Sequence, residues 1–226
     1  MNKVTQTAIL LGATGLTGGL LLHKLLKDNS FSKVTVFSRK PLAITHGKLE
    51  VHLIDVLQLQ EYATIFYADV VYCCIGSTKK KTPDHEVYRA IDYGIPVAAA
   101  QLCKKNGIPV FIVVSALGAD VKSTIFYSRI KGEMEEKVLA MHIEKTHILQ
   151  PSLIAGNREE RRSVEWISIQ MMKLLNYMLV GSLKKYRSIS PEVIADCMLW
   201  LTKNSFPWSR IASDQIGHIV QTHKEL

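Results

Sequence analysis

The first two thirds of the chain alternate short apolar runs with amphipathic stretches, and this pattern constrains the fold more than any other. The apolar runs lie at residues 7–12, 33–38, 49–55, 68–76, 110–116 and 146–154. Helical patterns separate them: LTGGLLLHKLLKD after the first run, a weak one near LQEYATIF, and longer ones over 84–106 and 124–142. Strands that alternate with helices form a parallel sheet covered on both faces. We therefore predict an α/β fold with an open, doubly wound parallel sheet of six strands.

After the sixth run the pattern changes to two helical stretches, SVEWISIQMMKLLNYMLVG and SPEVIADCMLWLTKN, with no clear strand between them. In the second stretch Ser190 is a natural N-cap and Pro191 suits the first helical turn. An α/β chain of this length is usually one domain, so we expect a single domain over residues 1–226. We expect its C-terminal part, 157–226, to lie across the carboxyl ends of the strands and to shape a substrate pocket.

Composition and charge limit the partners of this chain. Its 226 residues, 47% of them hydrophobic, can bury a sizeable core, which argues against intrinsic disorder. The net charge is +8, but Lys and Arg are dispersed and the longest basic run is Lys79–Lys81, so we expect a small-molecule ligand and no nucleic acid. No apolar stretch approaches membrane-spanning length and the N-terminus reaches a turn too early for a secretory signal. We expect a cytoplasmic protein; a homodimer or a protein partner stays open.

Cysteine and histidine spacing gives no indication of a metal site. Cys73, Cys74, Cys103 and Cys197 show no CxxC or Cys/His ligand spacing, and the eight histidines form no HExxH or dense cluster. Because Cys73 and Cys74 are neighbours inside an apolar run, they are interpreted as small buried hydrophobic residues in a reducing compartment. We expect no bound metal.

The segment LLGATGLTGG follows the first strand and opens the first helix, which is the context that a dinucleotide-binding turn needs. Gly12 would permit the tight turn, Gly15 would let the backbone approach the pyrophosphate, and Gly18 would let helix and strand pack closely. The neighbours predicted to contact the nucleotide with them are Thr14, Leu16 and Thr17. A merely structural turn is the alternative.

The second strand ends in FSRK, where the adenosine ribose of a nicotinamide cofactor is recognised. Ser38, Arg39 and Lys40 together could hold a 2′-phosphate, because arginine supplies charge-assisted donors in a fixed geometry. A solvated basic turn is the alternative. We therefore predict NADP in preference to NAD.

Two further strand ends are predicted to contact the cofactor. Asp55 ends the third strand beside Val56; its carboxylate could accept a hydrogen bond from the adenine amino group, cap a helix, or do both. Gly76, Ser77 and Thr78 end the fourth strand at the expected cofactor edge. The alternative is that these three residues only end the strand and begin a loop, without contacting a cofactor.

Three motifs, GATGLTG, VVSALGA and YSRIK, stand in this order at matching structural positions. With them the chain resembles the short-chain dehydrogenase/reductases. The short length, the glycine spacing and the segment QPSLIAGNREERRSVEW resemble the atypical subgroup, in particular the Tat-interacting-protein-like oxidoreductases and their bacterial relatives. The resemblance covers essentially the whole chain and implies a Rossmann fold that binds a nicotinamide cofactor.

The resemblance implies a catalytic set of Ser115, Tyr127 and Lys131. Ser115 would hydrogen-bond a carbonyl oxygen, and Tyr127 would exchange its proton as hydride moves to or from carbon. The Lys131 ammonium and an oxidised nicotinamide would lower the pKa of the Tyr127 phenol from about 10, because positive charge favours phenolate. Lys131 would also hold the nicotinamide ribose hydroxyls. Residues four apart share a helix face, so Tyr127 and Lys131 can serve one site.

The resemblance also assigns Pro151, Ser152, Leu153 and Ile154 to the nicotinamide side. One position departs from the family pattern. Where many members carry an asparagine in the helix after the fourth strand, this chain has Asp92. Asp92 either changes the proton relay or is an unrelated helix residue.

The leading hypothesis is an NADP-dependent oxidoreductase that acts on a small carbonyl or alcohol substrate. The alternative is a non-catalytic NADP(H) sensor that acts through a protein partner. The complete Ser/Tyr/Lys set favours the enzyme, since a sensor has no chemical need of it. A sugar-nucleotide epimerase is a further alternative, although the C-terminal part is short for a nucleotide-sugar pocket.

Overall fold

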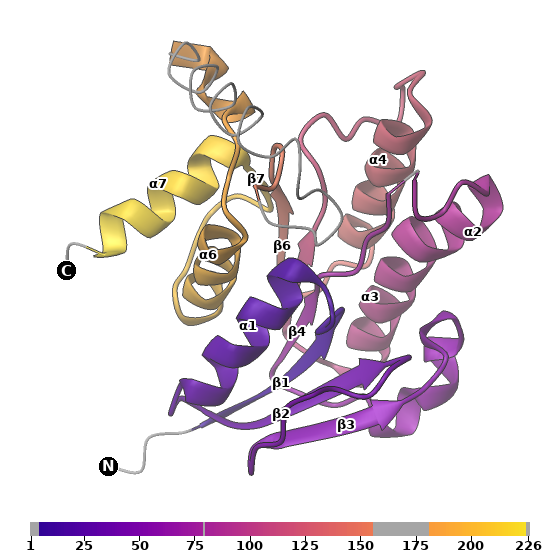
Figure 1. The fold of residues 1–226 in the computed structure, drawn as a ribbon, viewed down its shortest axis with the longest axis vertical. Coiled ribbons are helices and arrows are strands. Elements are labelled where there is room, and N and C mark those ends of the chain that lie inside the picture. The colour runs from indigo at the N-terminus through magenta and orange to yellow at the C-terminus, as the bar shows by residue number, and fades with distance from the viewer. Residues whose placement is uncertain (1–4, 79, 156–180, 225–226) are drawn as a thin grey trace, which may run out of the picture.

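The computed structural model describes residues 5–78, 80–155 and 181–224 of the chain. One parallel sheet runs through it in the order β3-β2-β1-β4-β5-β6-β7 (Figure 1). Its strands are β1 (Gln6–Leu11), β2 (Phe31–Ser38), β3 (Leu49–Leu53), β4 (Val70–Cys73), β5 (Val110–Val114), β6 (Lys145–Gln150) and β7 (Arg210–Ala212). The predicted fold class is confirmed, but the predicted number of strands is wrong by one. β7 has three residues, too few for an apolar pattern to reveal a strand.

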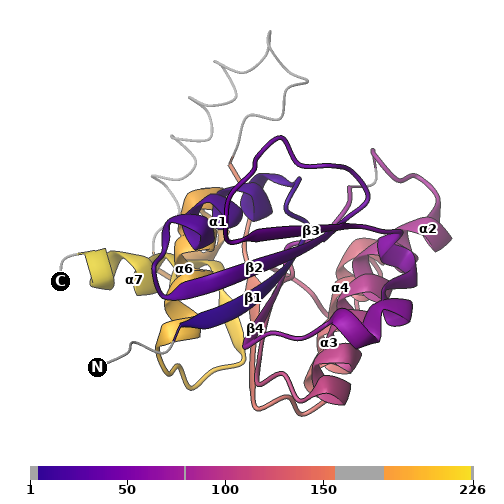
Figure 2. The ribbon, with the colours of Figure 1, turned by 90° about the horizontal axis from the view of Figure 1, so that it is seen from below.

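Helices cover both faces of the sheet (Figure 2). They are α1 (Leu16–Lys27), α2 (His85–Arg89), α3 (Ile95–Asn106), α4 (Phe126–Leu139), α6 (Pro191–Lys203) and α7 (Ser213–Lys224), with the 3₁₀ segments η1 (Val56–Ile65) and η3 (Gly181–Tyr186) and the π segment η2 (Ala90–Gly94). Successive strand residues point to opposite faces. Ala8 and Leu10 of β1 therefore enter the core beside α1, α6 and α7, whereas Ile9 and Leu11 enter the core beside η1, α3 and α4. Burial on both faces explains why the strands are apolar runs.

The helix predicted over 84–106 contains a π turn in the middle. Pro96 has no N–H group for the carbonyl of Asp92, four residues earlier, so the α-helical bonding is interrupted there. The N–H of Ile95 instead donates to the carbonyl of Ala90, five residues earlier. Such π turns are frequent at functional sites, and this one carries Asp92.

The C-terminal helix α6 packs against the main core of the protein. Ser190 caps α6 as predicted, its hydroxyl accepting a hydrogen bond from the amide of Val193 at 3.3 Å. α6 packs beside α1 and buries Met198 and Leu201 in the core, so it covers a face of the sheet. The apolar face of α6 belongs to the main core, and the substrate pocket expected of residues 157–226 stays a prediction. The helical pattern over 163–181 lies, except for its last residue, outside the described residues.

The four cysteines are free and belong to the packed interior. Cys73, Cys103 and Cys197 are buried and Cys74 is partly buried, and burial raises the pKa of each thiol. Within the described ranges, no group of three or more His, Cys, Asp or Glu side chains could hold a metal ion. In the same part of the chain, no helix has the length and hydropathy needed to cross a membrane.

His147 of β6 is expected to make stability depend on pH. Its Nδ1 lies 3.1 Å from the carbonyl oxygen of Trp208, and its Nε2 is buried without a hydrogen-bond partner among the described residues. Burial lowers the pKa of His147. As the pH falls, His147 therefore binds a proton in the unfolded chain more readily than in the folded protein. The contribution of neutral His147 to stability is present above pH about 6.5 and is lost as pH falls below that value.

Urea unfolding at several pH values between about 5 and 7.5 measures this effect. The variant His147→Gln has no titrating group at this position, and we expect its free energy of unfolding to fall less over the same interval. An identical pH dependence in the two proteins would show that His147 is not responsible.

Candidate functional site

The glycine turn lies where the strand order reverses, since β1 has β2 on one side and β4 on the other. Gly12 has φ +88°, and a Cβ there would stand 2.8 Å from the backbone of Cys74, which follows β4. A Cβ at Gly18 would stand 2.1 Å from the carbonyl oxygen of Gly12. Only glycine fits at both positions. The predicted tight turn and the predicted close packing are both confirmed.

The N-terminus of α1 fits an anion. Gly15 is the N-cap of the helix and is exposed, and its own amide donates to the carbonyl of Gly12 at 3.0 Å. No side chain of the described residues caps this end. Thr14 and Leu16 are exposed beside it, whereas Thr17 is buried. The amides of a first helical turn and the helix dipole favour a phosphate group. This end therefore offers a place for the pyrophosphate of a dinucleotide.

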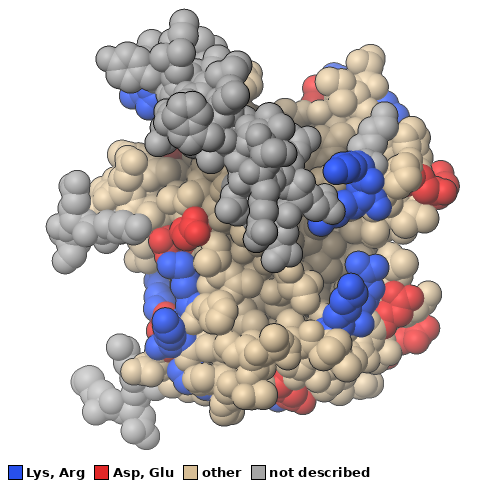
Figure 3. Space-filling model, viewed as in Figure 1, with Lys and Arg blue, Asp and Glu red and all other residues tan. Residues whose placement is uncertain are grey.

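The end of β2 presents two exposed basic side chains. The buried Ser38 shapes this turn, because its hydroxyl donates to the carbonyl of Lys40 at 2.8 Å. Arg39 and Lys40 are exposed, and no carboxylate of the described chain pairs with Arg39. Figure 3 shows Lys and Arg side chains gathered in several groups on one face of the molecule. Ser38 thus orients the backbone that carries Arg39 and Lys40.

Asp55 caps η1, which confirms the predicted helix cap. Its carboxylate accepts a hydrogen bond from the amide of Leu57 at 3.0 Å, while Val56 is buried in the core. Asp55 itself is exposed at the carboxyl end of β3. The adenine contact predicted for Asp55 and Val56 stays a prediction.

Asp92 and Lys131 form a buried ion pair. Asp92 is fully buried and Lys131 is 3% exposed, and the Asp92 Oδ1 lies 3.0 Å from the Lys131 Nζ. The other oxygen, Oδ2, accepts a hydrogen bond from the amide of Ser77 at 2.7 Å. A Cβ at Gly76 would stand 3.4 Å from Oδ1, so a glycine at this position avoids a close contact with the Asp92 carboxylate.

The pair keeps Lys131 protonated. Burial alone would lower the pKa of Lys131, but the nearby Asp92 carboxylate favours the ammonium, and the pKa is raised. Asp92 is therefore not an unrelated helix residue. It is the counter-ion of Lys131, and through Ser77 it also holds the loop that follows β4.

Ser115 follows the end of β5, where it was predicted, and its catalytic role stays a prediction. Its hydroxyl donates to the Oε1 of Glu135 at 2.5 Å, and Glu135 is 1% exposed. Glu135 also accepts hydrogen bonds from Gln150 and, at 2.7 Å, from the Nε of Arg210 on β7. The single hydroxyl proton of Ser115 is thereby engaged with a carboxylate. The sequence analysis missed Glu135, although its position one turn after Lys131 places it on the buried face of α4.

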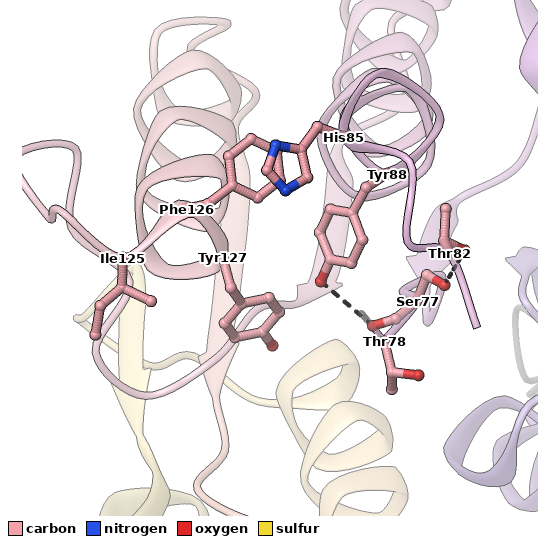
Figure 4. A pocket seen from close by; sticks show the side chains of 8 residues that line it. All are labelled: Ser77, Thr78, Thr82, His85, Tyr88, Ile125, Phe126 and Tyr127. Atoms are coloured by element: carbon pink, nitrogen blue, oxygen red, sulfur yellow. Dashed lines mark hydrogen bonds between the residues drawn. The ribbon is translucent and has the colours of Figure 1, made fainter. Parts of the chain in front are cut away.

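A cavity of about 340 Å³ opens beside the carboxyl end of β4 (Figure 4). It is lined by Ser77, Thr78, Thr82, His85, Tyr88, Ile125, Phe126 and Tyr127. These residues come from the loop after β4, from α2 and from the start of α4. Three predicted site residues, Ser77, Thr78 and Tyr127, are brought together here, whereas Ser115 and Lys131 do not line the cavity.

The segment predicted for the nicotinamide side joins a later part of the chain. The carbonyl of Pro151 accepts the amide of Leu117 at 2.9 Å. The carbonyl of Leu153 accepts the amide of Ile189 at 3.0 Å, and Ile154 pairs with Ile189 in a parallel bridge. The hydroxyl of Ser152 accepts a hydrogen bond from Ser213 of α7 at 3.0 Å. These hydrogen bonds hold the residues that precede α6 against the segment that follows β6.

Comparison with known proteins identifies relatives along most of the chain. The sequence model of a family described as NAD(P)H-binding matches residues 12–199. Protein HTATIP2 of Rattus norvegicus is 33% identical over 167 residues, which cover 72% of this chain and 69% of that protein. Protein FMP52-1, mitochondrial, of Scheffersomyces stipitis is 31% identical over 184 residues, which cover 79% of this chain and 76% of that protein.

Solved structures share the fold at low sequence identity. ADP-L-glycero-D-manno-heptose-6-epimerase of Helicobacter pylori superposes with a TM-score of 0.66 at 16% identity, covering 98% of this chain and 83% of that chain. UDP-N-acetylglucosamine 4-epimerase of Methanobrevibacter ruminantium superposes with a TM-score of 0.67 at 15% identity. The superposition again covers 98% of this chain and 83% of that chain. At such identities the similarity shows the fold alone.

Proposed function

Because this chain belongs to the NAD(P)H-binding family, among the atypical short-chain dehydrogenase/reductases, we propose that it is an NADP-dependent oxidoreductase that interconverts a small carbonyl compound and its alcohol. One observation carries the proposal. Tyr127 lines a cavity, and one turn further along α4 the buried Lys131 is held in its charged form by Asp92. A phenol beside a fixed ammonium is suited to proton exchange with a bound substrate.

In the proposed reduction, an NADPH held at the first turn of α1 and by Arg39 and Lys40 would supply the hydride. Tyr127 donates a hydrogen bond to the carbonyl oxygen and gives it its proton, so that hydride and proton together convert the carbonyl to an alcohol. The Lys131 ammonium favours the resulting phenolate. The hydroxyl proton of Ser115 is engaged with Glu135, so polarisation of the carbonyl falls to Tyr127.

The proposed cofactor site joins three strand ends. The first turn of α1 would hold the pyrophosphate, and Arg39 with Lys40 would hold a 2′-phosphate on the adenosine ribose. Arg39 supports NADP because it is exposed, carries a fixed charge and has no carboxylate partner in the described chain. The segment from Pro151 to Ile154 stays a proposed neighbour of the nicotinamide.

Arg39→Ala is expected to weaken NADPH binding about 10- to 100-fold and to leave NADH binding almost unchanged, because only NADPH carries the 2′-phosphate that the guanidinium would bind. Calorimetric titration of both nucleotides measures this difference. Lys105→Ala, which removes an exposed charge from the end of α3, is the matched control. Equal weakening of the two nucleotides by Arg39→Ala would refute the phosphate assignment.

A non-catalytic NADP(H) sensor is the second candidate, and the engagement of Ser115 with Glu135 favours it. A sensor would bind a protein partner with different affinity in its empty and NADP-loaded forms. Equal affinities, together with measurable turnover, would exclude it. Since several relatives are named as mitochondrial proteins, a cytoplasmic location also stays a prediction.

A further inference from the structure

Four rings form one wall of the cavity, and we call them the aromatic wall: His85, Tyr88, Phe126 and Tyr127 (Figure 4). His85 stacks on Phe126 with centroids 4.1 Å apart and an interplanar angle of 12°. Tyr88 meets Phe126 edge-on at 5.8 Å and Tyr127 edge-on at 6.2 Å. The rings therefore support one another across α2 and α4, and they hold a fixed apolar surface beside the Tyr127 hydroxyl.

Next to Tyr88, the loop after β4 gives the cavity a polar side. The hydroxyls of Ser77 and Thr82 lie 2.6 Å apart in a hydrogen bond, and the Tyr88 hydroxyl donates to the carbonyl of Ser77 at 3.4 Å. None of the described lining residues is Lys, Arg, Asp or Glu. A charged ligand group in this cavity would lose its hydration without a Lys, Arg, Asp or Glu side chain in the described lining to pair with it, and such a transfer is costly.

The nearest buried charged groups form an ion pair with each other. Lys131 and Asp92 lie behind the cavity wall and neutralise each other as an ion pair. The volume of about 340 Å³ is at the lower end of the range for small organic ligands. The cavity therefore combines an aromatic surface and hydroxyl groups, with no Lys, Arg, Asp or Glu in its described lining, in a space that suits one or two rings.

We propose that the cavity binds an uncharged, planar, ring-containing ketone or aldehyde, with its ring against the aromatic wall and its carbonyl oxygen at the Tyr127 hydroxyl. This proposal rests on the proposed oxidoreductase function and specifies its substrate class. Aromatic rings that pack edge-to-face or in offset stacks interact more favourably than their buried area alone predicts. A planar aromatic substrate would gain this interaction, whereas a saturated ring would not.

Calorimetric titration of the full chain, with and without NADP⁺, tests the proposal with four probes. The first is 2-acetonaphthone, a planar aromatic ketone, and the second is cyclohexyl methyl ketone, which is saturated. The others are 4-oxopentanoate, an anionic ketone, and UDP-glucose, a nucleotide sugar. We expect 2-acetonaphthone to bind about tenfold more tightly than each of the others. Tightest binding of any other probe, equal binding of all four, or no binding of any probe would overturn the proposed substrate class.

Phe126→Leu separates ring contact from general apolar contact. We expect it to weaken 2-acetonaphthone binding about 3- to 10-fold and to change cyclohexyl methyl ketone binding little, because leucine keeps apolar contact but not the ring. Tyr67→Leu, which removes an exposed ring that does not line the cavity, is the matched control and should change neither. An unchanged affinity for 2-acetonaphthone in a folded Phe126→Leu protein would contradict the aromatic wall.

The two proposals can fail separately. Binding of 2-acetonaphthone to the aromatic wall without any hydride transfer would support the cavity assignment and refute the oxidoreductase. Conversely, NADPH-dependent reduction of 4-oxopentanoate with a higher kcat/KM than 2-acetonaphthone would support the oxidoreductase and overturn the substrate class. The NADPH titration is independent of both outcomes.

Discussion

Tyr127→Phe is expected to lower turnover about 10²- to 10⁴-fold, because it removes the hydroxyl that exchanges a proton with the substrate. The ring stays in the cavity wall, so the affinity for NADPH should change by less than about threefold. Steady-state oxidation of NADPH with 2-acetonaphthone gives the turnover, and calorimetry gives the affinity. The loss should appear in kcat more than in KM, since the missing proton is needed only in the transition state.

Tyr88→Phe is the matched control for this change. The Tyr88 ring belongs to the same cavity, but its hydroxyl donates to the carbonyl of Ser77. Removing that hydroxyl should leave most of the turnover intact. If Tyr127→Phe kept full turnover, or if the two variants lost turnover equally, Tyr127 would not be the proton donor.

Asp92→Leu is expected to lower the free energy of unfolding by about 3–5 kcal/mol, because Lys131 is left as an unpaired buried charge. The amide of Ser77 would lose its acceptor at the same time. Lys131→Met should be destabilising as well, since it leaves the carboxylate buried and unpaired. The double variant Asp92→Leu/Lys131→Met removes both charges and should be more stable than either single variant. Urea unfolding of the four proteins measures these differences.

The double-mutant comparison also gives the outcome that would contradict the ion pair. If the losses in the two single variants simply added in the double variant, the two groups would not interact. Asp92→Asn provides a milder change, because its amide oxygen can still accept from Ser77 while the negative charge is gone. We expect its stability to lie between those of the wild type and Asp92→Leu.

The sequence was sufficient to predict the sheet and the glycine turn. Apolar runs buried on both faces of a parallel sheet are visible in any single sequence, and the steric demand at Gly12 and Gly18 is local. The three-residue β7 left no such pattern. The π turn was also missed, although Pro96 indicated an interruption four residues after Asp92.

The candidate site could be predicted only where its geometry is local. Tyr127 and Lys131 lie one helical turn apart, so their shared face follows from spacing alone. The partner of Lys131 is 39 residues away along the chain, on another helix, and only tertiary packing brings Asp92 to it. The same holds for Ser115 and Glu135, and for the rings of α2 that meet those of α4.

The most direct measurement is the transfer of deuterium to 2-acetonaphthone from NADPH that carries deuterium at both hydrogen positions of the nicotinamide C4, detected by mass spectrometry of the alcohol formed. We predict deuterium on the carbinol carbon with the wild-type protein, and about 10²- to 10⁴-fold slower labelling with Tyr127→Phe. Tight binding of NADPH without deuterium in the alcohol of any of the three probe ketones would contradict the oxidoreductase and leave a cofactor-binding protein without hydride transfer.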